Sequence, residues 1–177
     1  FMDLGRRVER AQAVAAELAR MLDSPGAASP GRLEPGLQLA LELRDSVITY
    51  RGRYLTVVQA APVLDLVLAD EGNPRSLAYQ LAALRDGLTE IGGDADEELA
   101  AVAEALLDDV HRMVRDVVRA GDQAAAAAQL PPRLHTMETA VAGLSNRLAD
   151  RYFALLPAAT RLGPDPDADP ARLRGAA

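Results

Sequence analysis

The sequence contains no cysteine, no lysine and no tryptophan, and aromatic side chains make up only 3% of its residues. Without cysteine, the chain cannot form disulfides, thiolate metal sites or cysteine nucleophiles. Abundant alanine and leucine with few aromatics favour closely packed helices over a β-sandwich or barrel. All 19 basic residues are arginine. Each therefore carries a planar guanidinium group that can bind a carboxylate or phosphate with two hydrogen bonds.

Long apolar runs and an excess of positive charge are also missing. No run approaches the ~18 apolar residues that a membrane-spanning helix needs. The net charge of −7 opposes non-specific binding to nucleic acid, which requires a basic surface. We therefore expect neither a membrane nor a nucleic-acid partner. With no visible signal peptide, we expect a cytoplasmic protein. The chain begins at Phe1, already inside a helical pattern, so a fragment of a longer protein is expected.

Apolar residues recur at helical spacing through most of the chain. This pattern predicts an all-α fold, an antiparallel helical bundle of about five longer helices plus one or two short helices. The first predicted helix ends near Asp23. The others run from Pro35 to Gln59, from Val63 to Asp70, from Pro74 to Ile91, from Asp94 to Gly121 and from Leu134 to Tyr152. A turn or short helix is predicted over Asp122–Gln129.

Two helix starts and one domain boundary follow from local signals. Asn73 before Pro74 is typical of an N-cap followed by proline at the first helical position. Asp94 with Glu97 resembles a capping box. We predict a helical bundle domain over residues 1–156. Residues 157–177 are rich in proline and aspartate and are predicted to be a disordered acidic, proline-rich tail or linker.

Signatures of catalysis and metal binding are weak. The sequence has no phosphate-binding glycine loop, no Gly-x-Ser-x-Gly and no His-Glu-x-x-His. Glu104, Asp108 and His111 share a helix face, and His135 and Glu138 form a second pair. A di-iron bundle needs Glu-x-x-His on two helices, whereas the first set has Asp and the second is reversed. We interpret both as solvated polar faces and expect no metal and no cofactor.

Three short motifs contain arginine in patterns that suggest a site, two of them with more than one arginine. They are Gly5-Arg6-Arg7-Val8-Glu9-Arg10, Tyr50-Arg51-Gly52-Arg53-Tyr54 and Asn73-Pro74-Arg75-Ser76. The third is predicted at a helix N-terminus, where free backbone N–H groups favour an anion. The glycines of the first two motifs cost about 1 kcal/mol each relative to alanine inside a helix, which predicts close helix–helix approach there. The candidate ligand- or partner-binding residues are Arg6, Glu9, Arg10, Tyr50, Arg53, Tyr54, Asn73, Arg75 and Ser76.

Two interpretations of these motifs remain open. In the first, the arginines pair with carboxylates and helix ends and fix the register of the helices. The candidate carboxylates are Glu9, Asp45, Asp65, Asp70 and Glu71. In the second, the arginines converge on a pocket for a carboxylate or phosphate ligand. Spacing along the chain favours the first interpretation, because structural ion-pair networks have the same pattern.

The same motifs carry a family resemblance. In order, Leu4-Gly5-Arg6-Arg7-Val8-Glu9-Arg10, Thr49-Tyr50-Arg51-Gly52-Arg53-Tyr54, Asn73-Pro74-Arg75-Ser76-Leu77 with Gln80, and Arg151-Tyr152-Phe153 resemble the alpha-E domain family, a bacterial all-helical domain of unknown function. Such domains are fused to, or encoded beside, proteins similar to circularly permuted ATP-grasp ligases, often near transglutaminase-like proteins. The resemblance implies an ATP-grasp-like partner, fused or separate, and an accessory role in ATP-dependent peptide or amide-bond formation. It implies no catalytic residues.

We therefore expect a non-catalytic accessory or binding module with an arginine-lined site for a partner or for an anionic small molecule or peptide. One alternative is an enzyme that uses carboxylate, tyrosine and arginine side chains, with Glu9, Tyr50, Arg53 and Arg75 as candidates. Another is a purely structural, homo-oligomeric helical scaffold. The catalytic residues of an enzyme of this kind are not identifiable from the sequence.

Overall fold

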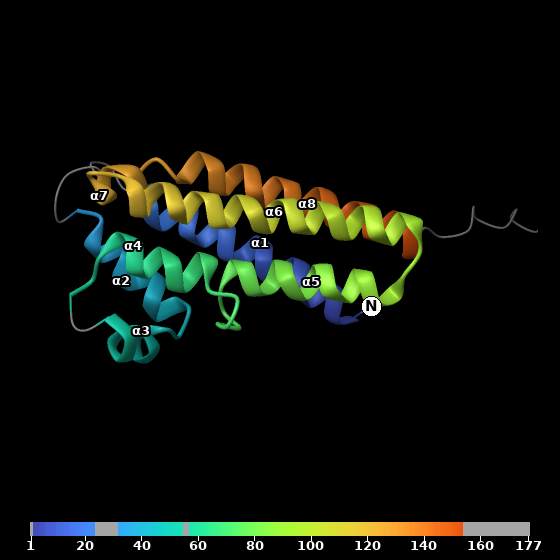
Figure 1. Cartoon of the computed structure of the whole chain (residues 1–177), viewed down its shortest axis with the longest axis horizontal. Coiled ribbons are helices and arrows are strands. Elements are labelled where there is room, and N and C mark those ends of the chain that lie inside the picture. Colours follow the sequence, from blue (N-terminus) through green and yellow to red (C-terminus); the bar gives the residue numbers. More distant parts are fainter. Residues whose placement is uncertain (1, 24–31, 55–56, 154–177) are drawn as a thin grey trace, which may run out of the picture. The chain divides into compact units, whose positions relative to one another are not determined.

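The computed structural model describes residues 2–23, 32–54 and 57–153. These residues form helices and turns without a strand, so the predicted all-α fold is confirmed (Figure 1). The predicted tail over 157–177 lies outside the described residues. The elements are α1 (Met2–Leu22), α2 (Glu34–Leu43), α3 (Val47–Tyr54), α4 (Ala60–Leu64), the π-helical turn η1 (Asp65–Ala69), α5 (Leu77–Ile91), α6 (Asp94–Arg119), α7 (Gln123–Ala127) and α8 (Pro131–Phe153).

The chain divides into two compact units, residues 1–146 and residues 147–177, and all elements except the last turns of α8 belong to the first. Within this unit α5 packs against both α1 and α6. Gly92 and Gly93, both with positive φ, reverse the chain between α5 and α6, so these two helices run antiparallel (Figure 1). None of the described helices is long and apolar enough to cross a bilayer.

The core is built from leucines and alanines at helical spacing. Ala11, Ala15 and Ala19 lie one turn apart on α1 and are fully buried. Their small side chains let neighbouring helices come close. Larger side chains from α1, α5, α6 and the π-helical turn fill the space between them: Leu18, Leu22, Leu66, Leu68, Leu77, Leu81, Leu84, Leu88 and Met113. The apolar stripes that predicted these helices therefore face one shared core.

The helix predicted from Pro35 to Gln59 is wrong, because the structure breaks it into α2 and α3 at Asp45. Asp45 has a φ of 47°, the left-handed conformation that aspartate tolerates better than most residues. The Asp45 N–H bonds the Glu42 carbonyl and the Ser46 N–H bonds the Leu41 carbonyl. This is the hydrogen-bond pattern of a Schellman cap, so the chain leaves the helix there.

The cap predicted at Asn73 is also wrong. The N-cap of α5 is Ser76, whose hydroxyl accepts the Tyr79 N–H at 3.0 Å. The Asn73 side chain instead accepts the Arg75 N–H at 3.1 Å, which makes a local turn before the helix. The predicted cap of α6 shifts as well, since the helix begins at Asp94 with Gly93 as its N-cap.

The close helix contact predicted at Gly5 and Gly52 is not found. A Cβ placed on either glycine meets no heavy atom within 4 Å. The close contact lies at Gly36 instead, in the first turn of α2, where a Cβ would come within 2.3 Å of the backbone oxygen of Met21 in α1. Helices α1 and α2 therefore touch backbone to backbone at this point.

Candidate functional site

The second and third arginine motifs meet around the π-helical turn and the loop that follows it. Arg53 at the end of α3 donates a 2.5 Å hydrogen bond to Asp70. Tyr54 donates to Asp65 at 2.9 Å. Asp65 begins the π-helical turn and Asp70 directly follows it. The Asp70 N–H donates a hydrogen bond to the Asp65 carbonyl, five residues earlier, which is the spacing of a π-helix. These contacts attach α3 to the segment before α5.

The loop before α5 is held by its own polar side chains. Asn73 donates to the Leu66 carbonyl at 2.9 Å and to the Ser46 hydroxyl at 3.3 Å. The Ser76 hydroxyl, besides capping α5, donates to the Asp70 carbonyl at 2.6 Å. Ser76 and Ser46 are buried, so these bonds satisfy polar groups that have no access to water. The loop conformation therefore depends on side chains of the third motif.

Arg53 and Arg75 both have carboxylate partners, as the structural interpretation of the motifs predicts. Arg75 pairs with Asp45 at 2.6 Å and Arg53 with Asp70 at 2.5 Å. The hydrogen bond that Arg53 donates to the Asp70 carboxylate raises the pKa of Arg53 above its usual value. Both arginines are about half exposed, and water screens the attraction between exposed charges. These pairs orient the arginines without contributing much to stability.

The tyrosines of the second motif have structural partners. Tyr50 is 2% exposed, and its hydroxyl donates to the Val57 carbonyl at 2.9 Å and accepts the Gln59 N–H at 3.1 Å. Burial and the bond to Asp65 raise the pKa of Tyr54, which makes it a poorer acid–base group near neutral pH. This arrangement gives no support to an enzyme built on these tyrosines.

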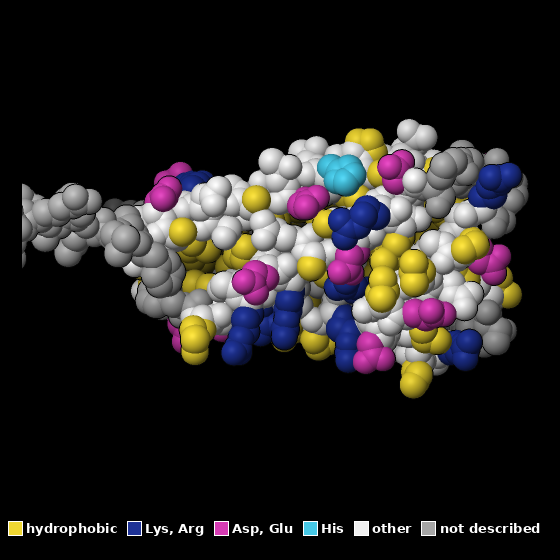
Figure 2. Space-filling view, turned by 180° about the vertical axis from the view of Figure 1, so that it is seen from behind, with side chains coloured by type: hydrophobic (Ala, Val, Ile, Leu, Met, Phe, Trp, Pro, Cys, Tyr) yellow, Lys and Arg dark blue, Asp and Glu magenta, His cyan; other side chains and the backbone are white. Residues whose placement is uncertain are grey.

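Arginines from three separate elements line one pocket of about 370 Å³. Arg10 comes from α1, Arg44 follows the end of α2, and Arg75 lies in the loop before α5. The remaining lining residues are Val14, Leu43, Pro74 and Gln80. The first and third motifs thus converge here, although they are about 65 residues apart in the sequence. In Figure 2 arginine side chains gather along the lower edge of the face shown, interleaved with carboxylates and apolar side chains.

The arginines of this pocket differ in how well their charge is compensated. Arg44 forms an ion pair with Glu17 of α1, and burial lowers the pKa of Arg44. Arg75 is paired with Asp45. For Arg10, no carboxylate of the described residues lies within ion-pair distance. Arg10 is exposed on α1, so within the described parts of the chain its positive charge in the pocket is not paired.

Gln80 lines the pocket with a buried polar side chain. It is 1% exposed, its amide donates to the Pro74 carbonyl at 2.5 Å, and its oxygen accepts from Arg7 at 3.4 Å. The Arg7 guanidinium also lies over the Tyr79 ring, 5.3 Å from its centre. Gln80 thereby links α1 to the loop that carries Arg75.

The other predicted residues lie outside this pocket. Arg6 and Glu9 are exposed on α1 and, within the part of the chain that the structure describes, have no ion-pair partner. The predicted residues of the second and third motifs that do not line the pocket are Tyr50, Arg53, Tyr54, Asn73 and Ser76. Sequence reasoning missed Arg44 and Gln80. The available signal was a polar residue on an apolar stripe, since Gln80 shares a face with Leu77 and Leu84.

The two histidine sets considered for metal binding have other contacts. Glu104 pairs with Arg85 at 2.6 Å. The Nε2 atom of His111 lies 3.3 Å from the Ala69 carbonyl and 3.5 Å from Glu71. His135 and Glu138 are 3.5 Å apart on α8. Among the described residues, no three histidine, aspartate or glutamate side chains come together as metal ligands would.

Comparison with known proteins gives a family and no activity. The model of the Alpha-E family, described as a predicted alpha-helical domain with a conserved ER motif, matches residues 1–153. The chain has a single Glu-Arg dipeptide, Glu9-Arg10, in α1. Uncharacterized proteins of Mycobacterium bovis and Mycobacterium tuberculosis are 30% identical over 115 residues, which is 65% of this chain and 12% of theirs. No solved structure is significantly similar.

Proposed function

Since the chain belongs to the Alpha-E family, we propose that it is a non-catalytic binding module whose arginine-lined pocket takes an anionic group. The observation that carries this proposal is the convergence of Arg10, Arg44 and Arg75 on one pocket, with Arg10 lacking a carboxylate partner among the described residues. A carboxylate or phosphate entering there accepts hydrogen bonds from the Arg10 and Arg75 guanidiniums, and such charge-assisted bonds are the strong ones.

The proposed partner is an ATP-grasp-like protein, fused or separate, which this domain assists in peptide or amide-bond formation. The family resemblance of the arginine motifs implies this partner. The chain spans 12% of the length of the mycobacterial relatives, which supports a module that works beside other domains. In this arrangement the arginine pocket holds an anionic group of the substrate or of the partner.

The anion site is tested by thermal unfolding in sodium acetate and in sodium phosphate, at ionic strength held constant with sodium chloride. Binding to the folded state at ten times the dissociation constant adds about 1.4 kcal/mol, which raises the Tm of a domain of this size by about 3–6 °C. We expect Arg10→Ala to lose this shift. A flat response of the wild-type protein to both anions contradicts the proposal.

Arg6→Ala is the matched control. Arg6 lies one turn from Arg10 on α1, is also exposed and does not line the pocket. Its removal changes the net charge by the same amount, so a general electrostatic effect alters both variants alike. An equal loss of the shift in Arg6→Ala and Arg10→Ala therefore contradicts a specific site at the pocket.

The partner is tested separately by titrating the purified domain against an ATP-grasp-like protein encoded in the same genome. We expect saturable binding that weakens in Arg10→Ala or Arg75→Ala and not in Arg6→Ala. Absence of binding at concentrations up to about 100 μM removes this partner from the proposal and leaves the anion site to stand on the first test.

A further inference from the structure

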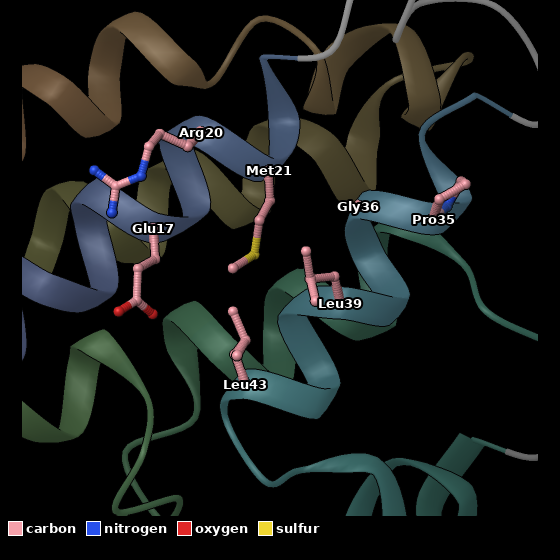
Figure 3. A pocket seen from close by; sticks show the side chains of 7 residues that line it. All are labelled: Glu17, Arg20, Met21, Pro35, Gly36, Leu39 and Leu43. Atoms are coloured by element: carbon pink, nitrogen blue, oxygen red, sulfur yellow. The ribbon is translucent and has the colours of Figure 1, made fainter.

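A second pocket of about 510 Å³ lies between α1 and α2 next to the arginine pocket. Its walls are mainly apolar, and Figure 3 shows the side chains of Met21, Leu39 and Leu43 pointing toward one another across it. Leu39 and Leu43 are 45% and 55% exposed, which is unusual for leucines that face a shared space. Leu43 lines both this pocket and the arginine pocket, so the two are neighbours.

One face of α1 runs beneath both pockets. Arg10 and Val14 line the arginine pocket, while Glu17 and Met21 line the apolar one. Their spacing of four, three and four places them in one stripe along the helix. The stripe from residue 10 to residue 21 is about 16 Å long at 1.5 Å per residue. An extended peptide covers that length with about five residues, at about 3.3 Å each.

The groove suits an extended chain better than a helix. A helix with its side chains is about 10–12 Å across, whereas α1 and α2 touch backbone to backbone at Gly36 beside the apolar pocket. Each pocket has the volume typical of a small-molecule site. Each can therefore take a side chain or a charged terminal group of a peptide.

The arginine end of the groove is bounded by other parts of the protein. Helix α2 ends at Leu43, and the loop residues Pro74 and Arg75, with Gln80 of α5, line the arginine pocket together with Arg10 of α1. In the arrangement proposed below, a peptide lying along α1 passes Arg44 and ends among these residues. A chain that stops there presents a terminal carboxylate, whose two oxygens match the forked guanidiniums of Arg10 and Arg75.

We infer that the two pockets form one groove that binds the C-terminal segment of a peptide or protein in an extended conformation. The terminal carboxylate of the peptide lies between Arg10 and Arg75. An aliphatic side chain of the peptide, about three residues before its C-terminus, packs against Met21, Leu39 and Leu43. Recognition of a chain end by fixed donors is a recurrent way of binding peptides. This inference rests on the proposed anion site and names the class of ligand.

The Glu17–Arg44 ion pair connects a residue that lines the apolar pocket with one that lines the arginine pocket, and it joins α1 to the end of α2. Burial lowers the pKa of Arg44, so the surroundings of this pair are poorly hydrated. Charges interact more strongly where water is displaced. Among the arginines of the pocket, this applies to Arg44, whereas Arg10 and Arg75 are exposed to water.

The test uses fluorescence anisotropy with the peptide Leu-Ala-Leu-Ala-Leu, labelled at its N-terminus with fluorescein and carrying a free C-terminal carboxylate. Three comparison peptides are the C-terminal amide, the amide with glutamate as its last residue, and the free acid with serine in place of each leucine. We expect the free acid to bind at least tenfold more tightly than either amide. We also expect the serine peptide to bind several-fold more weakly.

Protein variants locate the site. Arg10→Ala is expected to weaken the free acid about tenfold and to leave the amide unchanged, whereas Arg6→Ala changes neither. Leu43→Ala is expected to weaken the leucine peptide and not the serine peptide. Ile48→Ala is its control, because Ile48 is 87% exposed on α3 and does not line the groove.

The outcomes separate this inference from the proposed function. Equal binding of the acid and the plain amide, or of the acid and the glutamate amide, overturns recognition of a chain end. A second outcome is that acetate or phosphate binds through Arg10 while the peptide binds no more tightly than acetate. That result contradicts the peptide-binding groove and leaves the proposed anion site in place. If neither the small anions nor the peptide bind, the anion site and the groove both fail.

Discussion

Gly36→Ala tests whether α1 and α2 really touch at the narrow end of the groove. Adding a methyl group to a helical glycine normally stabilises the helix by about 0.5–1 kcal/mol. At Gly36 the new Cβ would lie 2.3 Å from the Met21 oxygen and 3.3 Å from its carbonyl carbon. Carbon–oxygen contacts in proteins are about 3.3 Å or longer. The two helices must therefore separate by about 1 Å.

The size of the effect follows from what blocks the methyl group. Overpacking of this kind costs about 1–3 kcal/mol, and the cost lies near the upper end when the obstacle is backbone, because a carbonyl cannot rotate away as a side chain does. After subtraction of the helix gain, we expect Gly36→Ala to lower the free energy of unfolding by about 2 kcal/mol. For a domain of this size this corresponds to a fall in Tm of about 4–8 °C.

Two other glycines give matched controls in the same assay, urea unfolding followed by circular dichroism. Gly52→Ala in α3 adds a methyl group with no heavy atom within 4 Å and should stabilise by up to about 1 kcal/mol. Gly87→Ala in α5 places its Cβ 2.9 Å from the Cδ2 atom of Leu4, a side chain that can move, so its effect should be intermediate. If Gly36→Ala is as stable as Gly52→Ala, the close approach of α1 and α2 is refuted.

Three further variants test the contacts that hold the site. Tyr50→Phe removes the hydroxyl that bonds the Val57 carbonyl and the Gln59 N–H and should cost about 0.5–1.5 kcal/mol in urea unfolding; an unchanged free energy of unfolding contradicts the assigned bonds. Ser76→Ala removes the cap of α5 and the bond to the Asp70 carbonyl and should cost about 1–2 kcal/mol, with Ser76→Thr retaining part of it. Arg44→Ala should cost about 1–3 kcal/mol, because it leaves Glu17 partly buried without a partner, and Glu17→Ala in the same chain should recover part of that loss. Additive losses in the double variant contradict a direct ion pair.

The sequence was sufficient for helices whose apolar side faces a single core. In α5, Leu77, Leu81, Leu84 and Leu88 follow one stripe and are all fully buried, and the stripe ends at Gly92, whose φ is positive. Burial of one face is a local consequence of spacing, so periodicity predicts it. The same holds for α1 and α6, which lie against α5.

The break at Asp45 could not be predicted in this way. Apolar residues continue at helical spacing on both sides of it, from Leu41 to Tyr50. Aspartate can adopt positive φ but does not require it, so the choice depends on contacts made elsewhere. Ser46 is buried and accepts a hydrogen bond from Asn73, which is 27 residues away. Such a tertiary bond is invisible in the pattern of either segment.

The start of α5 shows how two good local signals compete. Asn73 before Pro74 and Ser76 before Leu77 are both suitable caps. The amide of Asn73 is engaged by the Leu66 carbonyl and by Ser46, which fixes it in the loop and leaves Ser76 to cap the helix. Only the packing of the π-helical turn against this loop decides between them.

Part of the candidate site was predicted from the sequence, and the part that was missed depends, like the break at Asp45, on tertiary contacts. In the sequence, Arg10 stood out because it belongs to an arginine-rich motif, and Arg75 because it lies at a predicted helix N-terminus. Their convergence depends on how α1 passes the end of α2 and the loop before α5. Arg44 has no neighbouring arginine, and it joins the pocket because the break at Asp45 places it at a helix end. The error in the predicted helix therefore concealed the residue that completes the site.

The narrow contact at Gly36 and the arginine pocket are parts of one arrangement. Gly36, Leu39 and Leu43 lie along α2, so the distance between α1 and α2 at Gly36 also determines how far Leu43 and Arg44 are from Val14 and Glu17. A separation of about 1 Å is enough to misplace groups that must act together on one ligand. Gly36→Ala should thus weaken the binding of the leucine peptide more than that of acetate, since acetate needs only the arginines. Equal losses for both ligands would mean that the apolar and arginine pockets do not act as one groove.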